Sequence, residues 1–458
     1  MGVAVGINEI ILWILMLCMV LGGIDRAIGN KFGLGEQFEE GFNALGPLAL
    51  AMVGIISLSP VLATLLGPII NPVYSLVGAD PAMFAGTLLA CDMGGWPLAQ
   101  QMTANPQAAQ LSGLVLGSMM GATVVFTIPV SLGIIEKDDR GFLAKGILAG
   151  ICTIPVGVLI SGLIAGFPIG MVLINLIPIV TAALLIAFGL WRFPNAMTTG
   201  FEWFGKILLA IITVGLMIAV LEQVLHIKIM PAGWELTPVT EGLETVGLIA
   251  IVLLGAFPAV FLIIKLASKP LGKVGKLIGI NDTAAGGMIA TLANNIPMFQ
   301  VMKDMDNRGK VVNSAFAVSA AFAFGDHLGF VAGAESSMIA AVIAGKLVAG
   351  IAAVALALAV DVRKAQDDVL HAVNLTVHLK VLLHRELRQA VERHRLRRLR
   401  LAHGQIVLLH VAIGGGSRSE DDALDVRRAR RFQDTHRAQK ICLRIEQGIL
   451  DRDVDHRL

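Results

Sequence analysis

The sequence lacks the short motifs of many nucleotide-dependent enzymes and hydrolases. It has no P-loop, no glycine-rich dinucleotide fingerprint after a strand, no HExxH and no GxSxG. Cysteine is also scarce: Cys18, Cys91, Cys152 and Cys442 lie far apart, without a CxxC pair or another metal-ligand spacing. These absences argue against the corresponding enzyme classes, and we expect no enzyme activity, no cofactor and no bound metal.

Apolar residues, by contrast, are in excess. Of the 458 residues, 55% are hydrophobic, and the mean hydropathy is +0.76, which is too apolar for a soluble core. Apolar runs long enough to cross a bilayer fall near 8–24, 44–66, 108–135, 142–165, 171–190, 204–225, 243–264, 311–331 and 338–360. We therefore predict an all-α, multi-pass integral membrane protein with about nine spans.

Two further segments, 81–99 and 281–299, are too polar and too broken to be ordinary spans. They are rich in glycine, carry Asp or Asn, and contain Pro97 and Pro297. We predict that both are re-entrant hairpins buried within protein. If the N-terminus lies outside, a hairpin at 281–299 keeps the following cations on the inner side, as the positive-inside rule favours; these cations are Lys303, Arg308 and Lys310.

The two hairpins also belong to an internal repeat. Ala85-Gly86 aligns with Ala285-Gly286, and Pro97 aligns with Pro297, at an offset of 200 positions. Five spans separate corresponding elements, so the second copy is inverted, an arrangement typical of transporters with a site near the bilayer midplane. We predict a first repeat over 1–166, a linking span over 167–203 and a second repeat over 204–360.

Asp92 is the strongest candidate for a functional residue. It ends the apolar stretch FAGTLLACDMGG (84–95), where a carboxylate costs roughly 2.5 to 3.5 kcal/mol on insertion scales. Something must offset that cost. Asp92 either pairs with another protein group, or it lines a water-filled cavity and binds a cationic ligand.

Other polar residues in apolar sequence complete the candidate site. Trp96 offers an aromatic face, Asn294 and Asn295 offer amides, and Asp326 with His327 resembles a proton relay. Each has a structural alternative: the amides could satisfy loose backbone groups, and Asp326 could simply orient His327. Two intramembrane aspartates would also permit an aspartyl protease, but CDMGG and FGDH differ from the YD and GxGD contexts of such enzymes.

Two local patterns predict structure rather than chemistry. GSMMGATVVF (117–126) has small residues at helix-packing spacing, which indicates close contact with a neighbouring segment. The acidic run EQFEEGF (36–42) is most simply a solvated loop.

Four strings together are similar to a known family. QFEEGFNALGPLALAMVG (37–54), FAGTLLACDMGG (84–95), GSMMGATVVFTIPVSLGIIE (117–136) and FGDHLGFVAG (324–333) resemble the bacterial ethanolamine-utilisation membrane protein EutH, and the similarity covers about 7–360. The resemblance implies a permease of the bacterial cytoplasmic (inner) membrane that imports ethanolamine for catabolism, mainly at acidic pH. Its implied partners are ethanolamine and the lipid bilayer, with a homo-oligomer left open and no nucleic acid.

The polarity of the candidate residues agrees with that resemblance. A protonated amino alcohol needs a carboxylate or an aromatic face for its ammonium and an amide or hydroxyl for its OH. Asp92, Trp96, Asn294, Asn295 and Asp326 can supply these groups, and His327 is a candidate for proton transfer. A transporter of another small amine or polar metabolite, coupled to H⁺ or Na⁺, is the alternative within transport.

The resemblance ends near Val360. Residues 361–458 hold 20 of the 36 Lys and Arg and 8 of the 10 His, and this hydrophilic tail is unlike the short C-terminus of the family. We favour a shifted reading frame that yields a tail with no selected fold. The alternatives are a cytoplasmic regulatory domain and a basic helix at 385–400 that lies on anionic lipid.

Overall fold

The fold is built entirely of helices and connecting loops over residues 6–360, the part of the chain that this computed structural model describes. The predicted all-α class is therefore confirmed for these residues. Contacts between residues set 1–359 apart from the remainder of the chain as a unit of its own. The predicted hydrophilic tail, 361–458, lies outside the described residues.

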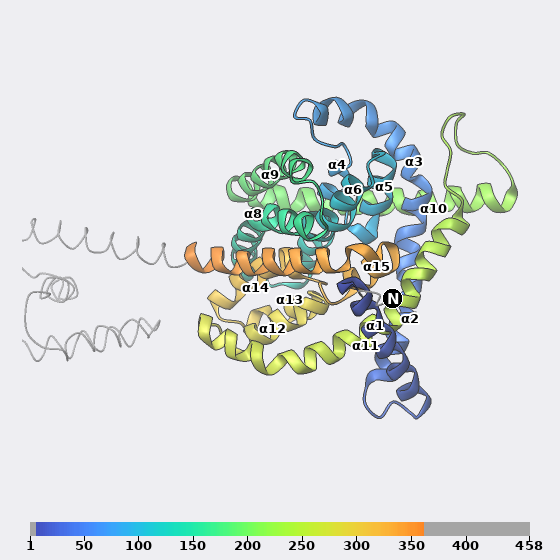
Figure 1. Cartoon of the computed structure of the whole chain (residues 1–458). Coiled ribbons are helices and arrows are strands. Elements are labelled where there is room, and N and C mark those ends of the chain that lie inside the picture. Colours follow the sequence, from blue (N-terminus) through green and yellow to red (C-terminus); the bar gives the residue numbers. More distant parts are fainter. Residues whose placement is uncertain (1–5, 361–458) are drawn as a thin grey trace, which may run out of the picture. The chain divides into compact units, whose positions relative to one another are not determined.

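Figure 1 shows the order of the elements. The first half contains α1 (Ile7–Ala27), α2 (Leu34–Asn43), α3 (Leu45–Ser75), α4 (Met83–Leu88), η1 (Cys91–Met93), α5 (Gly95–Met102), α6 (Pro106–Ala109), η2 (Gln110–Gly121), η3 (Thr123–Thr127), α7 (Ile128–Ile134), η4 (Lys137–Asp139) and α8 (Arg140–Ile164). Of these, η2 and η3 are π-helical, and η1 and η4 are short 3₁₀ turns.

The second half begins with three long helices, continues with shorter, interrupted ones and ends in another long helical segment. It contains α9 (Ile169–Arg192), α10 (Pro194–Leu225), α11 (Val239–Ile278), α12 (Asp282–Ala293), α13 (Ile296–Gln300), η5 (Met302–Asp304), α14 (Asn307–Ala320), α15 (Asp326–Ala334) and η6 (Ser336–Met338). The final described helical segment is Ser336–Val360.

Eight helical segments in the described part of the chain are long and apolar enough to cross a membrane. They correspond to eight of the nine predicted spans. The ninth, predicted as one helix over 311–331, is instead divided into α14 and α15 by a non-helical break at 321–325. Phe322 has φ +63°, and Gly325 has φ −120° and ψ −131°, so helical geometry ends at this break.

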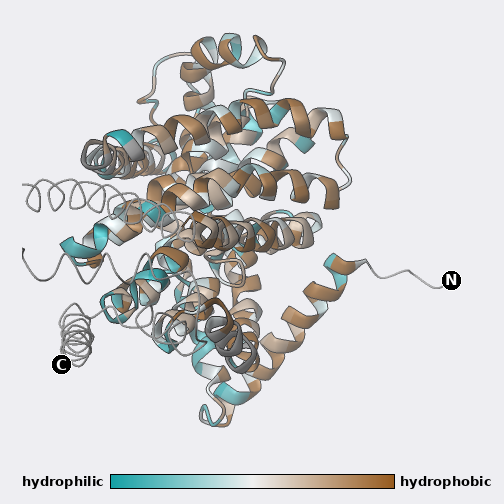
Figure 2. Cartoon of the chain, turned by 90° about the vertical axis from the view of Figure 1, so that its left-hand side faces the viewer, coloured by the Kyte–Doolittle hydropathy of each residue, from teal (hydrophilic) through white to brown (hydrophobic). Residues whose placement is uncertain are grey.

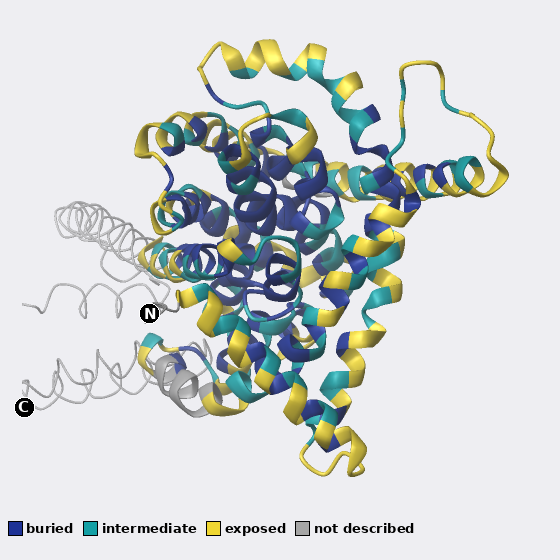
Figure 3. Cartoon of the chain, turned by 45° about the vertical axis from the view of Figure 1, so that its right-hand side comes forward, coloured by how far each residue is buried: buried dark blue, intermediate teal, exposed yellow. Residues whose placement is uncertain are grey.

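The segment 106–134 lies at the centre of the fold. Its most apolar stretch is 94% buried, whereas the corresponding stretches of α1 and 199–225 are 17% and 22% buried. Figure 3 shows the buried residues gathered in the middle of the unit, and Figure 2 shows that the exposed outer helices remain strongly apolar. This distribution is expected for helices whose outer faces contact lipid, because apolar side chains there need no protein cover.

Both predicted hairpin segments are interrupted helices. The first runs α4, an extended pair at Leu89 and Ala90, η1, and then α5, with Gly94 at φ +103°. The second runs α12, an extended Asn294, and then α13. Gly94 must be glycine on two grounds: its positive φ disfavours a side chain, and a Cβ there would lie 2.3 Å from Ile55.

The acidic run at 36–42 is helical, so its prediction as a solvated loop is wrong. It forms α2, which packs against α1 and α11. Asp25 at the end of α1 accepts hydrogen bonds from the backbone N–H groups of Phe32, Leu34 and Gly35. The Asp25 carboxylate thus satisfies the backbone donors at the start of α2, which a helix cannot satisfy itself.

Candidate functional site

A small internal cavity lies where the first interrupted helix, η3 and the α14–α15 break meet. Its volume is about 40 Å³, and about 10 to 15 Å³ on the same measure holds one water molecule. The cavity therefore has room for roughly three or four non-hydrogen atoms. Its walls are formed by Ala90, Asp92, Met93, Ala122, Phe126, Phe322, Asp326 and His327.

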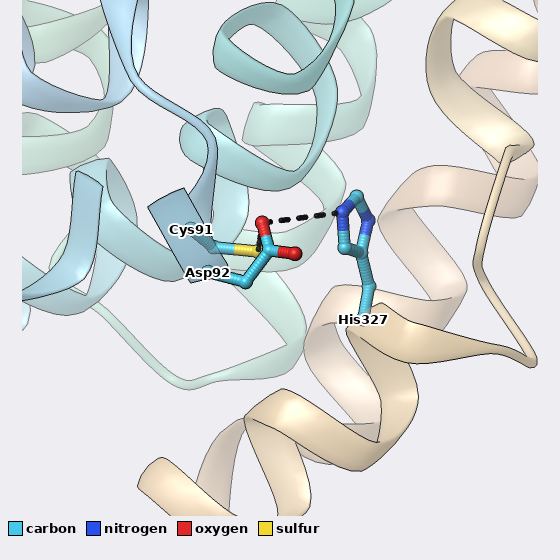
Figure 4. A group of neighbouring side chains, drawn as sticks. All are labelled: Cys91, Asp92 and His327. Carbon is cyan, nitrogen blue, oxygen red and sulfur yellow. Dashed lines mark hydrogen bonds and ion pairs between the residues drawn. The ribbon is translucent and has the colours of Figure 1, made fainter. Parts of the chain in front are cut away.

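Asp92 reaches this cavity because the first interrupted helix is broken just before it. Helix α4 ends at Leu88, the chain extends through Ala90, and η1 then turns the Asp92 side chain toward α15 (Figure 4). The Asp92 side chain is 20% exposed. Its carboxylate thus borders open space at the centre of an otherwise apolar fold.

A row of glycines on η2 allows the backbone of the first interrupted helix to lie directly against η2. A Cβ on Gly113 would meet the Trp96 Cα at 2.7 Å, one on Gly117 would meet the Cys91 N at 3.1 Å, and one on Gly121 would meet the Leu89 O at 1.9 Å. The predicted close contact of the GSMMGATVVF segment is therefore with the interrupted helix that carries Asp92. Small residues permit this approach of two backbones.

The α14–α15 break places the other polar residues of the cavity. The N–H groups of Phe322 and Phe324 donate to the carbonyls of Thr291 and Leu292 at the end of α12. These bonds hold Phe322 at φ +63°, a conformation that a bulky side chain adopts only under constraint. Helix α15 then begins at Asp326, so the positive end of the helix dipole stabilises this carboxylate.

Two carboxylates therefore line one cavity, but their surroundings differ. Asp92 Oδ1 lies 4.0 Å from His327 Nε2 and 4.0 Å from Cys91 Sγ. Asp326 makes no hydrogen bond or ion pair with any other described residue. Of the two, Asp326 is the carboxylate whose hydrogen-bonding capacity is unused.

His327 connects Asp92 to a buried cation. Lys346, on Ser336–Val360, is 1% exposed. Its Nζ lies 2.5 Å from the Ser118 carbonyl oxygen and 3.2 Å from His327 Nδ1. The imidazole lies between the two groups, with Nδ1 toward Lys346 Nζ. Figure 4 shows the other side of the ring, where Nε2 faces the Asp92 carboxylate.

With Lys346 as an ammonium, this geometry selects one tautomer of His327. A lysine ammonium has three donors and no acceptor, so Nδ1 must accept the hydrogen bond from Lys346. The imidazole proton is then on Nε2, where it points toward Asp92. His327 is therefore neutral in this arrangement, and it links the charges of Lys346 and Asp92.

The sequence-predicted residues divide into two groups. Asp92, Asp326 and His327 line the cavity, whereas Trp96, Asn294 and Asn295 do not. Trp96 is buried against η2.

The two asparagines lie at the second helix break. Asn294 Oδ1 accepts from the Ile296 N–H at 2.9 Å, and Asn295 Nδ2 donates to Thr127 Oγ1 at 3.1 Å. Asn294 thus stabilises the backbone of the break, and Asn295 joins it to the central segment 106–134.

Phe126, Phe322 and Lys346 are part of the site or its surroundings, although the sequence analysis did not select them. Phe126 and Phe322 form an edge-to-face pair with centroids 5.5 Å apart, and Phe322 also contacts the His327 ring at 5.0 Å. Nothing in an apolar sequence distinguishes these two phenylalanines. Lys346 did carry a signal, because it is a lone cation in an apolar span.

The site also contains atoms that could hold a metal ion. Cys91 Sγ, an Asp92 oxygen and a His327 ring nitrogen all lie within 4.8 Å of one another, and zinc uses such donors. Lys346 opposes this use, because a dication on Nε2 would face the ammonium across a single imidazole ring.

Comparison with known proteins assigns most of the described chain to one group. The family model described as "Ethanolamine utilisation protein, EutH" matches residues 7–360. Curated relatives carry the name "Probable ethanolamine permease EutH". The Listeria monocytogenes relative is 57% identical over 76% of this chain and 93% of its own.

The Salmonella typhimurium relative of the same name is 50% identical, and the one from Escherichia coli is 49% identical; both alignments cover 77% of this chain and 95% of the relative. No solved structure matches the chain.

Proposed function

The chain belongs to the EutH family of ethanolamine utilisation proteins, and from this premise we propose that it is a permease that carries protonated ethanolamine across the bacterial cytoplasmic membrane. Members of this family are named as permeases, so the chain is a transporter rather than an enzyme. The aspartyl-protease alternative is thereby excluded. The observation that supports the substrate most directly is the polar cavity between Asp92 and Asp326.

The cavity matches ethanolamine in size and chemistry. Ethanolamine has four non-hydrogen atoms, and the cavity has room for roughly three or four. We propose that its ammonium binds at Asp326, the carboxylate without a partner among the described residues, beside the rings of Phe126 and Phe322. The hydroxyl would then lie near Asp92 and the His327 Nε2–H, which can accept and donate a hydrogen bond respectively.

We also propose that the two interrupted helices are re-entrant hairpins of two inverted repeats. The breaks fall at corresponding positions, since Gly94 and Asn294 both lie outside helical geometry. The segments that follow also begin alike: the side chains of Asn105 and Asp306 each accept a backbone N–H at the start of a helix. The correspondence supports a central site that opens to each side in turn.

Transport of the ammonium form gives the permease its main use at acidic pH. The neutral amine crosses lipid unaided, whereas the protonated amine needs a polar path. Carboxylates in the cavity favour the cation over the neutral amine. Coupling to H⁺ or Na⁺ is not required for import, because metabolic trapping of ethanolamine would sustain an inward gradient.

The test is uptake of labelled ethanolamine into proteoliposomes at acidic and neutral external pH. We expect saturable uptake at acidic pH by the wild type. Asp326→Asn and Asp92→Asn should each lower it roughly ten- to hundredfold, the usual effect of losing a charge-assisted hydrogen bond. Wild-type flux no greater than that of empty liposomes would contradict the proposed function.

A further inference from the structure

Lys346 is a buried cation that does not reach the cavity. It is 1% exposed and is absent from the cavity wall. Around it, α8 approaches closely, because a Cβ on Gly157 would meet the Gly345 carbonyl at 2.8 Å. The ammonium is therefore held in place without touching the cavity. It can influence a bound substrate through its electric field or through its contact with His327.

The charges around the cavity can be counted for the state in which both carboxylates and the lysine are ionised. In that state Asp92 and Asp326 contribute two negative charges, Lys346 contributes one positive charge, and His327 is neutral in the tautomer that a Lys346 ammonium selects. The sum is −1, which one monovalent cation neutralises. Glu40 on α2 also acts electrostatically on Asp326, but it is exposed, and water and salt screen it.

We propose that Lys346 is a specificity-determining residue that sets the charge of the transported substrate at +1. This inference rests on the proposed function and deepens it. Lys346 acts as a positioning residue through His327, whose ring it holds with Nε2–H toward Asp92. By compensating Asp92, it leaves Asp326 as the single uncompensated carboxylate for the substrate ammonium.

The physical basis is the weak screening at the centre of the fold. Charges in such surroundings interact far more strongly than in water, so an occupied cavity that is not neutral is disfavoured. Without Lys346 the two carboxylates would accept a dication better than a monocation. In the wild type, the charge of the accepted substrate therefore depends on Lys346, a residue that the substrate does not touch.

Ethylenediamine is a suitable probe of this inference. It has the length of ethanolamine but carries a second amine in place of the hydroxyl, and at acidic pH both amines are protonated. The measurement is competition by ethylenediamine against labelled ethanolamine in proteoliposomes at acidic external pH. The wild type should discriminate strongly in favour of ethanolamine.

Two variants test the charge count. In Lys346→Met the sum becomes −2 when His327 stays neutral, and we expect the preference to shift toward ethylenediamine by about ten- to hundredfold, as for the loss of one charged partner. In Lys346→Met combined with Asp326→Asn, the sum returns to −1, and Asp92, released from Lys346, supplies the single charge. Preference for ethanolamine should return in this double variant.

The outcomes are distinct. An unchanged preference in Lys346→Met, or the same preference in the single and double variants, would overturn the inference. Loss of both variants from the membrane would also overturn it, since Lys346 would then be needed for folding whatever the charge of the cavity. A wild type without saturable uptake would contradict the proposed function itself, and with it this inference.

Discussion

His327 lies between a buried ammonium and a carboxylate, and both of its ring nitrogens face a partner. Nδ1 accepts from Lys346 at 3.2 Å, and Nε2 lies 4.0 Å from Asp92 Oδ1. Two roles are consistent with this position. A relay moves a proton through the ring, whereas a fixed bridge only holds Lys346 and Asp92 in place.

A pair of substitutions at His327 separates these roles. A glutamine side chain has a carbonyl that can accept from Lys346 and an amide that can donate to Asp92, but it does not titrate. If His327 is a fixed bridge, His327→Gln should keep much of the acid-side ethanolamine uptake. His327→Leu leaves the ammonium and Asp92 without that partner and should lower uptake by about tenfold or more.

Ethanolamine uptake by the two variants is measured with the same assay over a range of external pH. Equal loss in His327→Gln and His327→Leu would contradict the fixed bridge and favour the relay predicted from the Asp326-His327 pair.

Sequence alone found the charged residues of the site better than its uncharged ones. Asp92 and Asp326 stand out because a carboxylate in an apolar run needs a compensating partner. Lys346 gives the same signal, because it is a lone cation in an apolar run, but the sequence analysis did not select it. For Asn294 and Asn295, polarity could not show whether the side chains face the cavity. The geometry of the break turns the Asn294 amide toward the neighbouring backbone and the Asn295 amide toward Thr127.

At the scale of the elements, the contact between η2 and the first interrupted helix is highly sensitive to side-chain size. We expect Gly121→Ala to destabilise the protein and to abolish most uptake. Its new methyl group would lie 1.9 Å from the Leu89 carbonyl oxygen, so the interrupted helix that carries Asp92 must shift. Overpacking of this kind costs about 1 to 3 kcal/mol.

Gly133→Ala is the matched control for this substitution. Gly133 lies on α7 in the same apolar segment, and nothing lies within 4 Å of its would-be Cβ. Thermal unfolding in detergent should show a lower Tm for Gly121→Ala and an unchanged or slightly higher Tm for Gly133→Ala, since alanine favours a helix. Equal Tm values for both variants would contradict the close contact.

A second element-level interaction joins η4 to α14. Lys310 Nζ lies 2.5 Å from Asp139 Oδ1, and the two side chains are only 11% and 5% exposed. Removing one member of a buried pair leaves the other charge uncompensated, which costs about 3 to 5 kcal/mol. We expect Asp139→Asn to lower the Tm markedly.

The exposed pair Lys206–Glu202 provides the comparison. Its side chains are 61% and 49% exposed, so Glu202→Gln should leave the Tm nearly unchanged. A smaller decrease in Tm for Asp139→Asn than for Glu202→Gln would show that burial does not determine how much these ion pairs contribute to stability.

The elements themselves were predictable to the extent that hydropathy defines them. Eight spans follow from long apolar runs, because a bilayer requires about that length. The break at 321–325 does not follow, since AFAFG is as apolar as its surroundings and the backbone there bonds to α12, far away in sequence. Helix α2 was missed for a related reason: its acidic face is solvated, while Gly35 and Gly41 lie buried on the other side.

At the scale of the whole molecule, every residue of the candidate site lies within 1–359, the unit defined by internal contacts. The family model likewise ends at residue 360. We therefore expect a chain shortened to residues 1–360 to reach the membrane and to take up ethanolamine at the rate of the full chain per mole of protein. The comparison uses purified protein in liposomes of one composition, so that expression does not enter the result.

Varying the lipid distinguishes the remaining hypotheses for 361–458, which lie outside the described residues. If the basic stretch 385–400 binds anionic lipid, uptake by the full chain should change with the fraction of anionic lipid, and uptake by 1–360 should not. If the tail has no selected fold, the two chains should respond alike. Loss of uptake on shortening, in every lipid, would contradict both and would indicate that the tail supports the transport cycle.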